Sequence, residues 1–499
     1  MISIVVRNVN SRIFGLDDIG IIDAISGALT YVTDNAKYSF KYKMGAWDGS
    51  TRLLTKNLSF ATGLLSLVEG VLQDYGAEYE IRDEREIIHF SSPESPWYGH
   101  SIYDYQKEVV DTALREKRGM VQVATGGGKT LIIGKLAHEF GDLPIVIYVV
   151  SLDLLSQMHS DLQQWLGKDI GIVGDGLCDI KNITVCSAWT VGKAFTKKSK
   201  DDTTEEDVVE DKWDPSEAQK RLIREMAECA RVVILDEAQF AAAHSIKTIL
   251  DNSKGAVYKY GFSGTPWRTG GDDLLLEAAF GKKIVQITAS ELIDGGYLVP
   301  PKIAMRDIPP YHVELPQNWK AVHANYIVNN ELRNNILIAN TVHLLEMGRK
   351  PLILFREHKH GKILRDMIPS DVRVRMVTGK LGKEERDKIR EDFKAGEIDL
   401  LLASTVYDQG VDLPGLDALI KAGGGKSTAK ALQRIGRVIR GNKAGGKKDA
   451  YVVDTFDQAM YVRGHSIARY NVYCTEPRFI LKASDKLFKA VKTVDRWRK

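Results

Sequence analysis

Cysteine is scarce in this sequence, and the few cysteines are not spaced for metal binding. The 499 residues include four, Cys178, Cys186, Cys229 and Cys474, and none belongs to a CxxC pair or to zinc-finger spacing. The sequence therefore indicates neither a structural zinc nor a disulfide framework, and it fits a reducing compartment. Long apolar runs are also missing, because no stretch approaches the roughly 18 residues that cross a bilayer. We expect a protein without a membrane span.

A strong excess of one charge is missing as well. The 69 Lys and Arg residues stand against 66 Asp and Glu residues, which gives a formal net charge of +3. Any contact with nucleic acid must therefore depend on local clusters of basic residues. Residues 1–12 also lack the basic start and the cleavage site of a signal peptide, so we expect a cytoplasmic protein.

Two series of alternating apolar strands and helices follow a mixed N-terminal segment. In the first series, strands are expected at 120–123, 145–150, 183–186 and 232–235. In the second series, they are expected at 351–355, 373–377, 400–403, 418–420 and 450–453. Such alternation predicts the α/β fold class, with two tandem, doubly wound parallel sheets.

The N-terminal segment, residues 1–92, predicts a small α+β domain. Its strands are expected at 2–6, 38–43, 51–54 and 78–82, and its helices at 16–29 and 64–75. Residues 91–96, which are rich in serine and proline, read as a linker.

The two βα series then define domains over 93–300 and 301–475. Residues 196–217 interrupt the first series with a polar, acidic stretch, for which we expect a surface insertion. Residues 476–499 contain eight Lys or Arg against three acids, and their near-helical apolar spacing predicts a basic C-terminal helix.

A glycine-rich loop lies between the strand expected at 120–123 and a helical pattern over 131–140. Consecutive glycines let the backbone wrap round an anion, and the helix N-terminus adds positive potential. Lys129 would neutralise the β- and γ-phosphates of ATP, and the Thr130 hydroxyl would bind Mg²⁺. The residues expected to hold the nucleotide here are Thr125, Gly126, Gly127, Gly128, Lys129 and Thr130. A glycine turn without a ligand is the alternative.

The apolar stretch 231–235 ends in two adjacent acids, Asp236 and Glu237. Ligands of open parallel sheets bind at the carboxyl ends of the strands, which is where these side chains would lie. We expect Asp236 to hold Mg²⁺ and Glu237 to polarise the attacking water as the general base. A helix cap at a solvated surface is the alternative.

These segments belong to an ordered set that resembles the motifs of superfamily 2 helicases. The set comprises Tyr105-Gln106, 123–130, 236–239, 263–266, 404–412 and the QxxGRxxR sequence 433–440. The resemblance implies two RecA-like domains that hydrolyse ATP at a shared cleft, with Gln106 reading the adenine. Two positions depart from the pattern. Val123 replaces a glycine of the strict phosphate-loop motif, and Gln239 stands where many relatives have histidine, although glutamine can also donate and accept hydrogen bonds.

The resemblance assigns the remaining nucleotide contacts to the second domain. An arginine from a neighbouring domain can stabilise the charge on the transferred phosphoryl group. Arg437 and Arg440 lie three apart, so on a helix they would share a face, and Arg440 is assigned to the γ-phosphate. Gln433 would bind water or phosphate, while Gly410 and Asp412 would contact the nucleotide or its ribose. A solvated basic helix is the alternative for the arginines.

Hydroxyl-bearing segments of the core are candidates for contacts with a nucleic-acid backbone. They include Ser151, Ser187 and Thr405, with helix capping as the alternative for each serine and threonine. Trp267-Arg268 is a further candidate, for which local packing is the alternative.

Basic and aromatic residues also gather near the N-terminus, in the run FKYKMGAWDG over 40–49. Lys41, Lys43 and Arg52 would contact phosphates, and Trp47 would stack on a base. A hairpin with Trp47 in a small core is the alternative. The run resembles T4-type phage helicases, and the motor core is similar to the XPB and RecG group of motors that engage double strands.

This closer resemblance implies a DNA helicase that unwinds or branch-migrates forked and Holliday-type DNA in recombination, repair and replication-fork processing. It implies a phage-encoded monomer in the host cytoplasm, with recombination or single-strand-binding proteins as partners. Three alternatives stay open: an RNA helicase, a duplex translocase that does not separate strands, and a structural DNA-binding protein with a decayed ATP site. The sequence has neither the DEAD form of the acidic motif nor an RRM-like or KH-like signature, which argues against the first.

Overall fold

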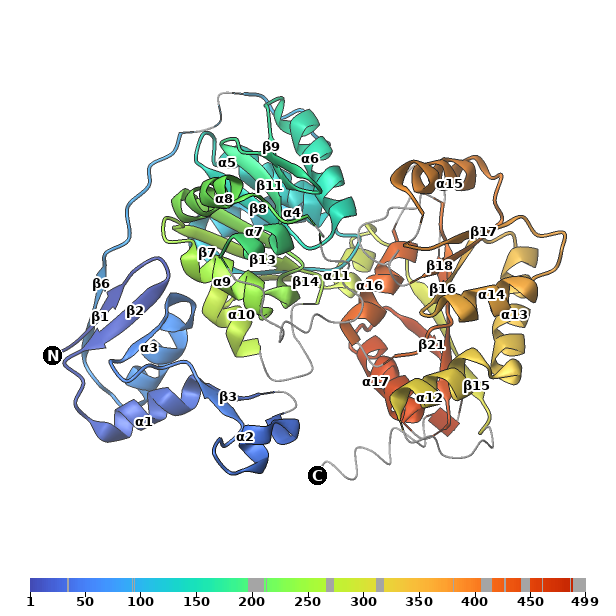
Figure 1. The fold of residues 1–499 in the computed structure, drawn as a ribbon, viewed down its shortest axis with the longest axis horizontal. Helices are drawn as coiled ribbons and strands as arrows, with labels where there is room; N and C mark the ends of the chain where they lie inside the picture. Colours follow the sequence, from blue (N-terminus) through green and yellow to red (C-terminus); the bar gives the residue numbers. More distant parts are fainter. Residues whose placement is uncertain are drawn as a thin grey trace. The chain divides into compact units, whose positions relative to one another are not determined.

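Figure 1 shows the computed structural model of the chain. It describes residues 1–33, 36–91, 93, 95–195, 211, 213–265, 273–310, 318–379, 381–404, 415–425, 428–440, 449–459, 461–484 and 486–487. By its internal contacts the chain forms two compact units. Unit 1 comprises Met1–Val123 and Gly128–Gln286, and unit 2 comprises Ala124–Gly127 and Ile287–Lys499.

The N-terminal region of unit 1 contains a four-stranded sheet in the order β5-β2-β1-β6. Its strands are β1 (Ile2–Val6), β2 (Asn10–Phe14), β5 (Ser59–Ala61) and β6 (Tyr79–Asp83). Helices α1 (Ile19–Ala28) and α3 (Leu65–Asp74) contribute Ile25, Val68 and Leu72 to the core of this region. One face of each helix is apolar at the helical period, so that face is buried. The small α+β region expected from the sequence is present.

A second, two-stranded sheet extends from this region. β3 (Thr30–Val32) pairs antiparallel with β4 (Ser50–Arg52), and between them lie the short helices η1 (Ala36–Tyr38) and α2 (Phe40–Lys43). The strand predicted over 38–43 is therefore wrong. Alternation of apolar and polar residues indicates a strand only when one face is buried, and all four residues of α2 are exposed.

The rest of unit 1 is built on an eight-stranded sheet in the order β10-β9-β11-β8-β12-β13-β7-β14. The strands are β7 (Arg118–Val123), β8 (Ile145–Val149), β9 (Gly171–Gly174), β10 (Leu177–Asp179), β11 (Ile183–Ser187), β12 (Val232–Asp236), β13 (Tyr258–Ser263) and β14 (Lys283–Ile287). The strands from β9 to β7 are parallel, whereas β10 pairs antiparallel with β9. The four strands predicted here are confirmed, because each is a largely buried apolar run.

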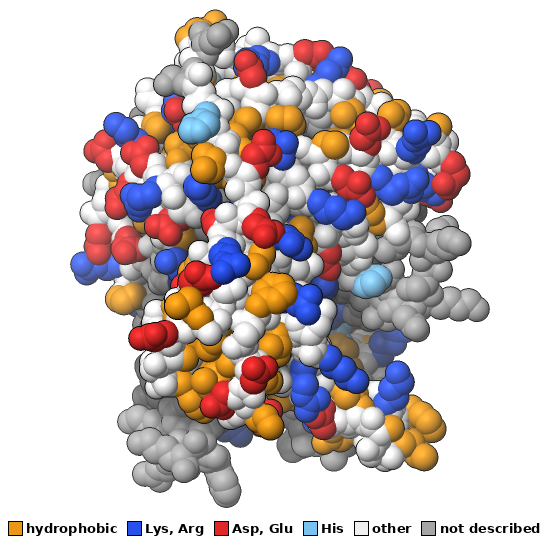
Figure 2. All heavy atoms as spheres, turned by 90° about the vertical axis from the view of Figure 1, so that its left-hand side faces the viewer, with side chains coloured by type: hydrophobic (Ala, Val, Ile, Leu, Met, Phe, Trp, Pro, Cys, Tyr) orange, Lys and Arg blue, Asp and Glu red, His pale blue; other side chains and the backbone are white. Residues whose placement is uncertain are grey.

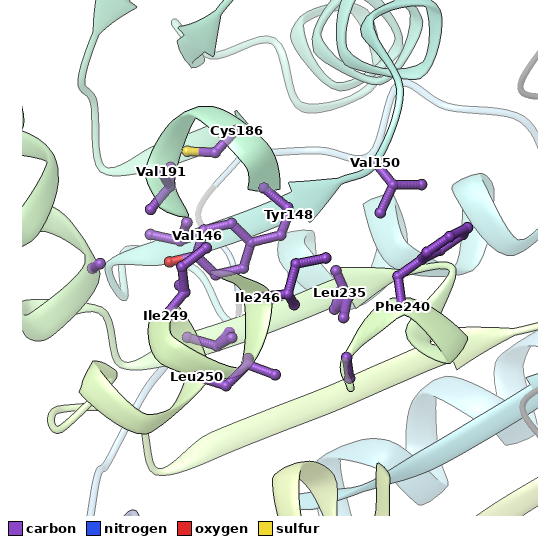
Figure 3. Close-up of a cluster of buried hydrophobic side chains, with 14 of the residues drawn as sticks. Val146, Tyr148, Val150, Cys186, Val191, Leu235, Phe240, Ile246, Ile249 and Leu250 are labelled. Carbon is purple, nitrogen blue, oxygen red and sulfur yellow. The ribbon is translucent and has the colours of Figure 1, made fainter. Parts of the chain in front are cut away.

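Helices cover this sheet and close a hydrophobic core on it. They are α4 (Asp104–Glu116), α5 (Lys129–Glu139), α6 (Leu152–Leu166), α7 (Ala188–Phe195), α8 (Glu217–Cys229), α9 (His244–Asn252) and α10 (Asp273–Phe280). Figure 3 shows part of this core, where Tyr148 of β8 and Leu235 of β12 lie with Ile246 and Leu250 of α9. Burying such a side chain contributes roughly 1.5–3 kcal/mol, so the packing fixes β12 and the acidic residues at its end.

The N-terminal region packs against α10 through a close contact of Gly63. Gly63 belongs to the short helix η2 (Thr62–Leu64), and a Cβ added there would lie 2.0 Å from the carbonyl oxygen of Glu277. Leu274 and Ala278 of α10 also pack against the N-terminal core. Any residue larger than glycine at this position would therefore force the two elements apart.

Unit 2 contains a seven-stranded sheet in the order β17-β18-β16-β19-β20-β15-β21, whose neighbouring strands pair in parallel. The strands are β15 (Pro301–Ile308), β16 (Pro351–Phe355), β17 (Val374–Val377), β18 (Leu400–Ser404), β19 (Ala418–Lys421), β20 (Ala450–Asp457) and β21 (Ile480–Lys482). The five strands predicted for this region are confirmed.

Unit 2 also contains eight described helical elements. They are α11 (Ala289–Asp294), α12 (Trp319–His323), η4 (Ala324–Val328), α13 (Glu331–Glu346), α14 (His358–Asp366), α15 (Lys383–Ala395), α16 (Thr428–Val438) and α17 (Val462–Tyr473). Ile353, Phe355 and Leu402 lie at the centre of the core. The prediction of two doubly wound parallel sheets is confirmed. No helix in the described part of the chain is both long and apolar enough to cross a membrane.

The C-terminal end departs from the basic helix predicted over 476–499. Ile480–Lys482 forms β21, with Leu481 opposite Ile303 of β15. Ser484 Oγ donates a hydrogen bond to Asp307 Oδ1 at 2.6 Å, which holds the chain beyond β21 near β15. The helix prediction is wrong at the strand, because pairing with β15 satisfies backbone groups that a sheet edge would leave open. Residues 488–499 lie outside the described residues.

Candidate functional site

The glycine-rich loop connects β7 to α5, as the sequence predicts. Gly126 and Gly128 have positive φ angles of 91° and 76°, in the left-handed region that favours glycine. Gly128 is the N-cap of α5, and no side-chain hydrogen bond caps this end of the helix. The N–H groups of the first turn point along the positive end of the helix dipole, so this arrangement suits an anionic ligand.

Gln106 of α4 lies against this loop. Its side chain is buried, and its Oε1 accepts a hydrogen bond from the Tyr103 N–H at 2.9 Å. A Cβ added to Gly128 would lie 2.5 Å from Gln106 Nε2, so the carboxamide packs on the glycine backbone. Sequence reasoning expected an adenine contact here, and that contact stays a prediction.

Asp236 is the last residue of β12 and Glu237 follows it, at the same edge of the sheet as the glycine loop. Asp236 is 4% exposed, forms no ion pair with any described residue, and accepts a hydrogen bond from the Glu237 N–H at 2.9 Å. Burial and the adjacent charge of Glu237 raise the pKa of Asp236 to about 7, while Lys129 opposes the rise. A buried carboxylate whose charge the protein does not neutralise fits a divalent cation.

Glu237 is connected to residues 263–265 through Gln239. Gln239 Nε2 donates a hydrogen bond to Glu237 Oε2 at 2.8 Å, and Ser263 Oγ donates one to Gln239 Oε1 at 2.7 Å. The Thr265 N–H donates in turn to Ser263 Oγ at 3.1 Å. The carboxamide of Gln239 therefore donates on one side and accepts on the other. We call these four residues the Glu237–Thr265 relay.

The backbone at Glu237 supports this relay. Its φ angle of 59° lies in the left-handed region, which is uncommon for a residue with a Cβ and is typical of functional sites. Sequence reasoning identified both segments of the relay but missed the contact between them. The contact depends on β12 and β13 being neighbours in the sheet, which the order of motifs along the chain does not reveal.

The two arginines predicted for the site in unit 2 do not lie on the same helix. Arg437 lies on α16, whereas Arg440 lies beyond this helix, which ends at Val438. The prediction that they share one helix face is therefore wrong. The chain leaves the helix because the Val299 N–H donates to the Ile439 carbonyl oxygen at 2.8 Å and Arg440 forms a β-bridge with Leu298.

Gln433 also lies on α16, one turn before Arg437. Residues Ala124–Gly127 of the glycine loop belong to unit 2 with Arg440, and a Cβ added to Gly126 would lie 3.4 Å from Arg440 Cγ, so Arg440 lies beside this part of the loop. Lys129 belongs to unit 1, so the approach of Gln433, Arg437 and Arg440 to Lys129 stays a prediction. Other predicted residues lie outside the described residues: Thr405, Gly410, Asp412, Trp267-Arg268 and most of the acidic segment.

The two predicted backbone-contacting serines act as helix caps in this structure. Ser151 is the N-cap of α6, and its hydroxyl accepts a hydrogen bond from the Leu154 N–H at 3.3 Å. The hydroxyl of Ser187, a residue only 2% exposed, accepts one from the Thr190 N–H at 3.4 Å. Capping accounts for both serines here, and their contact with nucleic acid stays a prediction.

The basic residues of the N-terminal region differ in how their charge is used. Lys41 and Lys43 are exposed, and neither forms an ion pair with another described residue. Arg52 pairs with Asp48 at 2.8 Å, and hydrogen bonds from Ser50 and Arg52 lower the pKa of Asp48 to about 2. The local positive charge is therefore concentrated at the two lysines. Trp47 is half-buried, and its Nε1–H donates to the Ser50 carbonyl oxygen at 2.7 Å.

Comparisons with protein families cover parts of both parallel sheets. Residues 99–268 match the family described as type III restriction enzyme, res subunit. Residues 331–442 match the helicase conserved C-terminal domain. The first match spans the glycine loop, the acid pair and the relay, and the second includes α13 to α16.

Two relatives align with most of the chain. The ATP-dependent DNA helicase UvsW of Enterobacteria phage T4 is 24% identical over 454 residues, which covers 86% of each chain. The DNA 3'-5' translocase XPB2 of Sulfurisphaera tokodaii is 26% identical over 412 residues, which covers 74% of this chain and 85% of the relative.

A solved structure shows the shared fold. Dbp5 of S. cerevisiae, bound to RNA and ADP BeF3, matches with a TM-score of 0.51 and 15% identity, over 79% of this chain and 93% of Dbp5. The order of the motifs, the two family matches and the paired sheets agree with one another. The chain therefore has a helicase fold with two RecA-like parallel sheets, and it resembles superfamily 2 helicases such as UvsW.

Proposed function

We propose that this protein is an ATP-dependent DNA helicase or translocase that acts on forked and Holliday-type DNA. The observation that carries the proposal is the buried carboxylate of Asp236, which ends β12 and has no ion-pair partner among the described residues. Burial and Glu237 together outweigh the charge of Lys129 and raise the pKa of Asp236 to about 7. Such a carboxylate suits a divalent cation that arrives with a nucleotide.

Unit 1 would bind the phosphates and activate the water. Lys129 and the first-turn N–H groups of α5 would hold the β- and γ-phosphates, with Thr130 and Asp236 as the ligands for Mg²⁺. Bound Mg²⁺ would offset the negative charge of the phosphate oxygens. Glu237 would take the proton of the attacking water, and Gln239 would hold its carboxylate in place.

Unit 2 would complete the reaction centre. We assign Arg437 and Arg440 to the charge that develops on the transferred phosphoryl group. Gln433, Gly410 and Asp412 would contact the nucleotide or its water, and Gln106 of unit 1 would read the adenine. Hydrolysis would then depend on both units closing round ATP, which gives the alternating grip that a motor needs.

DNA is the favoured track because the names of both aligned relatives specify DNA. We propose that residues 1–92 form a DNA-binding domain, ahead of motor domains over 93–300 and 301–475. Ser151, Ser187 and Thr405 would contact the strand backbone. The work would be branch migration or unwinding in recombination, repair and fork processing by a phage-encoded monomer in the host cytoplasm, alongside recombination or single-strand-binding proteins.

ATP turnover on a panel of nucleic acids tests the proposal. We expect the rate to rise strongly with forked and four-way DNA, and less with blunt duplex or single strands. Lys129→Ala should lower the stimulated rate by more than about 10²-fold, because it removes the charge next to the phosphates, and should leave DNA affinity largely unchanged. A rate that no DNA changes would contradict the proposal, and stimulation by RNA forks alone would identify an RNA helicase.

A further inference from the structure

The segment Phe40–Met44, which we call the knuckle, exposes large apolar side chains on the N-terminal region. Phe40 is 76% exposed, Met44 is 67% exposed and Tyr42 is 43% exposed. Neighbouring apolar side chains of this size are normally covered by the protein, so a group of them in solvent marks a contact site. The knuckle lies between β3 and β4, where Figure 1 shows α2 at the lower edge of the N-terminal region.

The backbone of the knuckle is held by hydrogen bonds. The Met44 N–H donates to the Phe40 carbonyl oxygen and the Ala46 N–H to that of Lys41, both at 3.0 Å. At the base, the Thr33 N–H donates to the Gly49 carbonyl oxygen at 2.8 Å. A hydrogen-bonded helical turn therefore holds the backbone that presents these apolar side chains to solvent.

Positive charge alternates with these apolar side chains. Lys41 and Lys43 are exposed between Phe40, Tyr42 and Met44, and neither lysine has an ion-pair partner among the described residues. In the lower part of the view in Figure 2, basic and hydrophobic side chains lie side by side. An apolar contact surface with this charge is complementary to a ligand that offers flat apolar faces next to anionic groups.

We propose that the knuckle binds unpaired DNA bases where a duplex ends, with Phe40 and Met44 against base faces and Lys41 and Lys43 near the flanking phosphates. This inference rests on the proposed function and names the part of a fork that the N-terminal region contacts. Within a duplex, neighbouring base pairs cover the faces of each base. Only bases that have left the stack can therefore receive apolar side chains, whereas lysines bind paired and unpaired strands alike.

The test compares a forked DNA with a blunt duplex of the same paired sequence, using the full chain and fluorescence anisotropy. Phe40→Ala with Met44→Ala should weaken fork binding by roughly tenfold, the effect of losing about one stacked base, and should leave duplex binding within about twofold. Lys41→Ala with Lys43→Ala should weaken binding to both DNAs. It should also reduce the slope of log affinity against log salt concentration by roughly 1.5. The apolar double variant should keep the wild-type slope.

A matched control removes exposed apolar side chains elsewhere in the same region. Ile19 and Tyr75 are 74% and 56% exposed, so Ile19→Ala with Tyr75→Ala removes one aliphatic and one aromatic side chain without touching the knuckle. This variant should bind both DNAs like the wild type. Phe40→Trp should restore fork binding when combined with Met44→Ala, because the larger ring replaces the stacking surface.

A direct probe separates stacking from folding effects. A fork that carries 2-aminopurine at the first unpaired position should lose fluorescence on binding wild-type protein and lose much less with the apolar double variant. Equal loss of fork and duplex affinity, or unchanged fork affinity, would overturn the inference, and in the second case a protein partner would be the better occupant of the knuckle. If wild-type protein neither binds DNA nor responds to it in ATP turnover, the proposed function itself fails.

Discussion

Two buried aspartates near the carboxyl ends of parallel strands have opposite surroundings. Asp236 ends β12 in unit 1, and Asp454 lies in the second half of β20 in unit 2. Each accepts a hydrogen bond from the following backbone N–H, at 2.9 Å and 2.8 Å respectively. The backbone settings are alike, so the difference between the two carboxylates comes from their side-chain neighbours.

Asp454 is surrounded by partners from the protein itself. Its Oδ2 accepts hydrogen bonds from Lys421 Nζ at 3.1 Å, from Arg469 Nε at 2.9 Å and from the Tyr473 hydroxyl at 2.7 Å. Burial would raise the pKa of Asp454, but Arg469 and Lys421 hold this pKa far below its usual value. The pKa of Asp236 is instead raised by burial and Glu237.

The contrast teaches how a ligand site differs from a structural ion cluster. Both acids are buried, so burial alone does not identify function. Asp454 has its cations within the fold, and removing it would leave them without a counter-charge. Asp236 is charged at neutral pH only at a cost to the fold, and a cation brought by the nucleotide would remove that cost.

Replacing each aspartate with asparagine should give the largest and most opposite effects. Asp454→Asn should lower the free energy of unfolding by about 3–5 kcal/mol, because Lys421 and Arg469 stay buried without a counter-charge. Asp236→Asn should raise the free energy of unfolding of the nucleotide-free protein at pH 8 and should reduce ATP turnover by more than about 10²-fold. Urea unfolding and a coupled ATPase assay measure the two quantities.

The pH dependence of unfolding provides the control for this pair. The raised pKa of Asp236 means that the folded state binds this proton more tightly than the unfolded state, so its ionised form destabilises the protein increasingly from about pH 4 to about pH 7. The stabilising effect of Asp236→Asn should therefore shrink as the pH falls through this window. Destabilisation by Asp236→Asn at pH 8 would show that its carboxylate holds the fold.

The rate of ATP turnover should depend on pH through the ionisation of Asp236. Below its pKa of about 7, Asp236 carries a proton that competes with Mg²⁺, so the rate at limiting Mg²⁺ should fall several-fold as the pH drops from about 8 to about 6. Raising Mg²⁺ should move this fall to lower pH. A profile that is insensitive to the concentration of Mg²⁺ would mean that another group limits the rate.

Among the substitutions in the site, a smaller effect than at Asp236 is expected at Gln239, whose side chain bonds to Glu237 and Ser263. Gln239→Ala removes both hydrogen bonds and should reduce DNA-stimulated ATP turnover by about tenfold, the value of one hydrogen bond to a charged group. Gln239→His should retain most of the rate, because the ring can also donate and accept. The matched control is Gln219→Ala, which removes two hydrogen bonds that Ser216 donates to Gln219 Oε1 at the start of α8 and should not change the rate.

Sequence patterns predicted the parts of the fold that depend on continuous burial. The runs at 145–150 and 232–235 became central strands because every residue of β8 and β12 is buried. β13 was not predicted, since its sequence YKYGFS includes Lys259, whose Nζ reaches the Leu250 carbonyl oxygen at 2.9 Å inside the core. A lysine interrupts the apolar pattern that predicts a buried strand. Its burial is explained by the hydrogen bond to the Leu250 carbonyl oxygen, which the sequence does not reveal.

In the candidate site, too, some features could be predicted from the sequence and others could not. The positions of Lys129 and Asp236 could be predicted, because a strand, a loop and a helix in sequence fix where such residues lie, and their roles stay predictions. The Gln239–Ser263 hydrogen bond could not, because it joins residues 24 apart through the neighbouring strands β12 and β13. The position of Arg440 also escaped prediction, since the end of α16 depends on a backbone pairing with Leu298.

The contact of Gly63 with α10 has a mechanical consequence. Leu274 and Ala278 of α10 are partly buried against the core of the N-terminal region, so a tilt of this region would expose apolar side chains. A force on the N-terminal region would therefore be transmitted to the eight-stranded sheet through α10. A bulkier residue in place of Gly63 would push α10 away and weaken this connection.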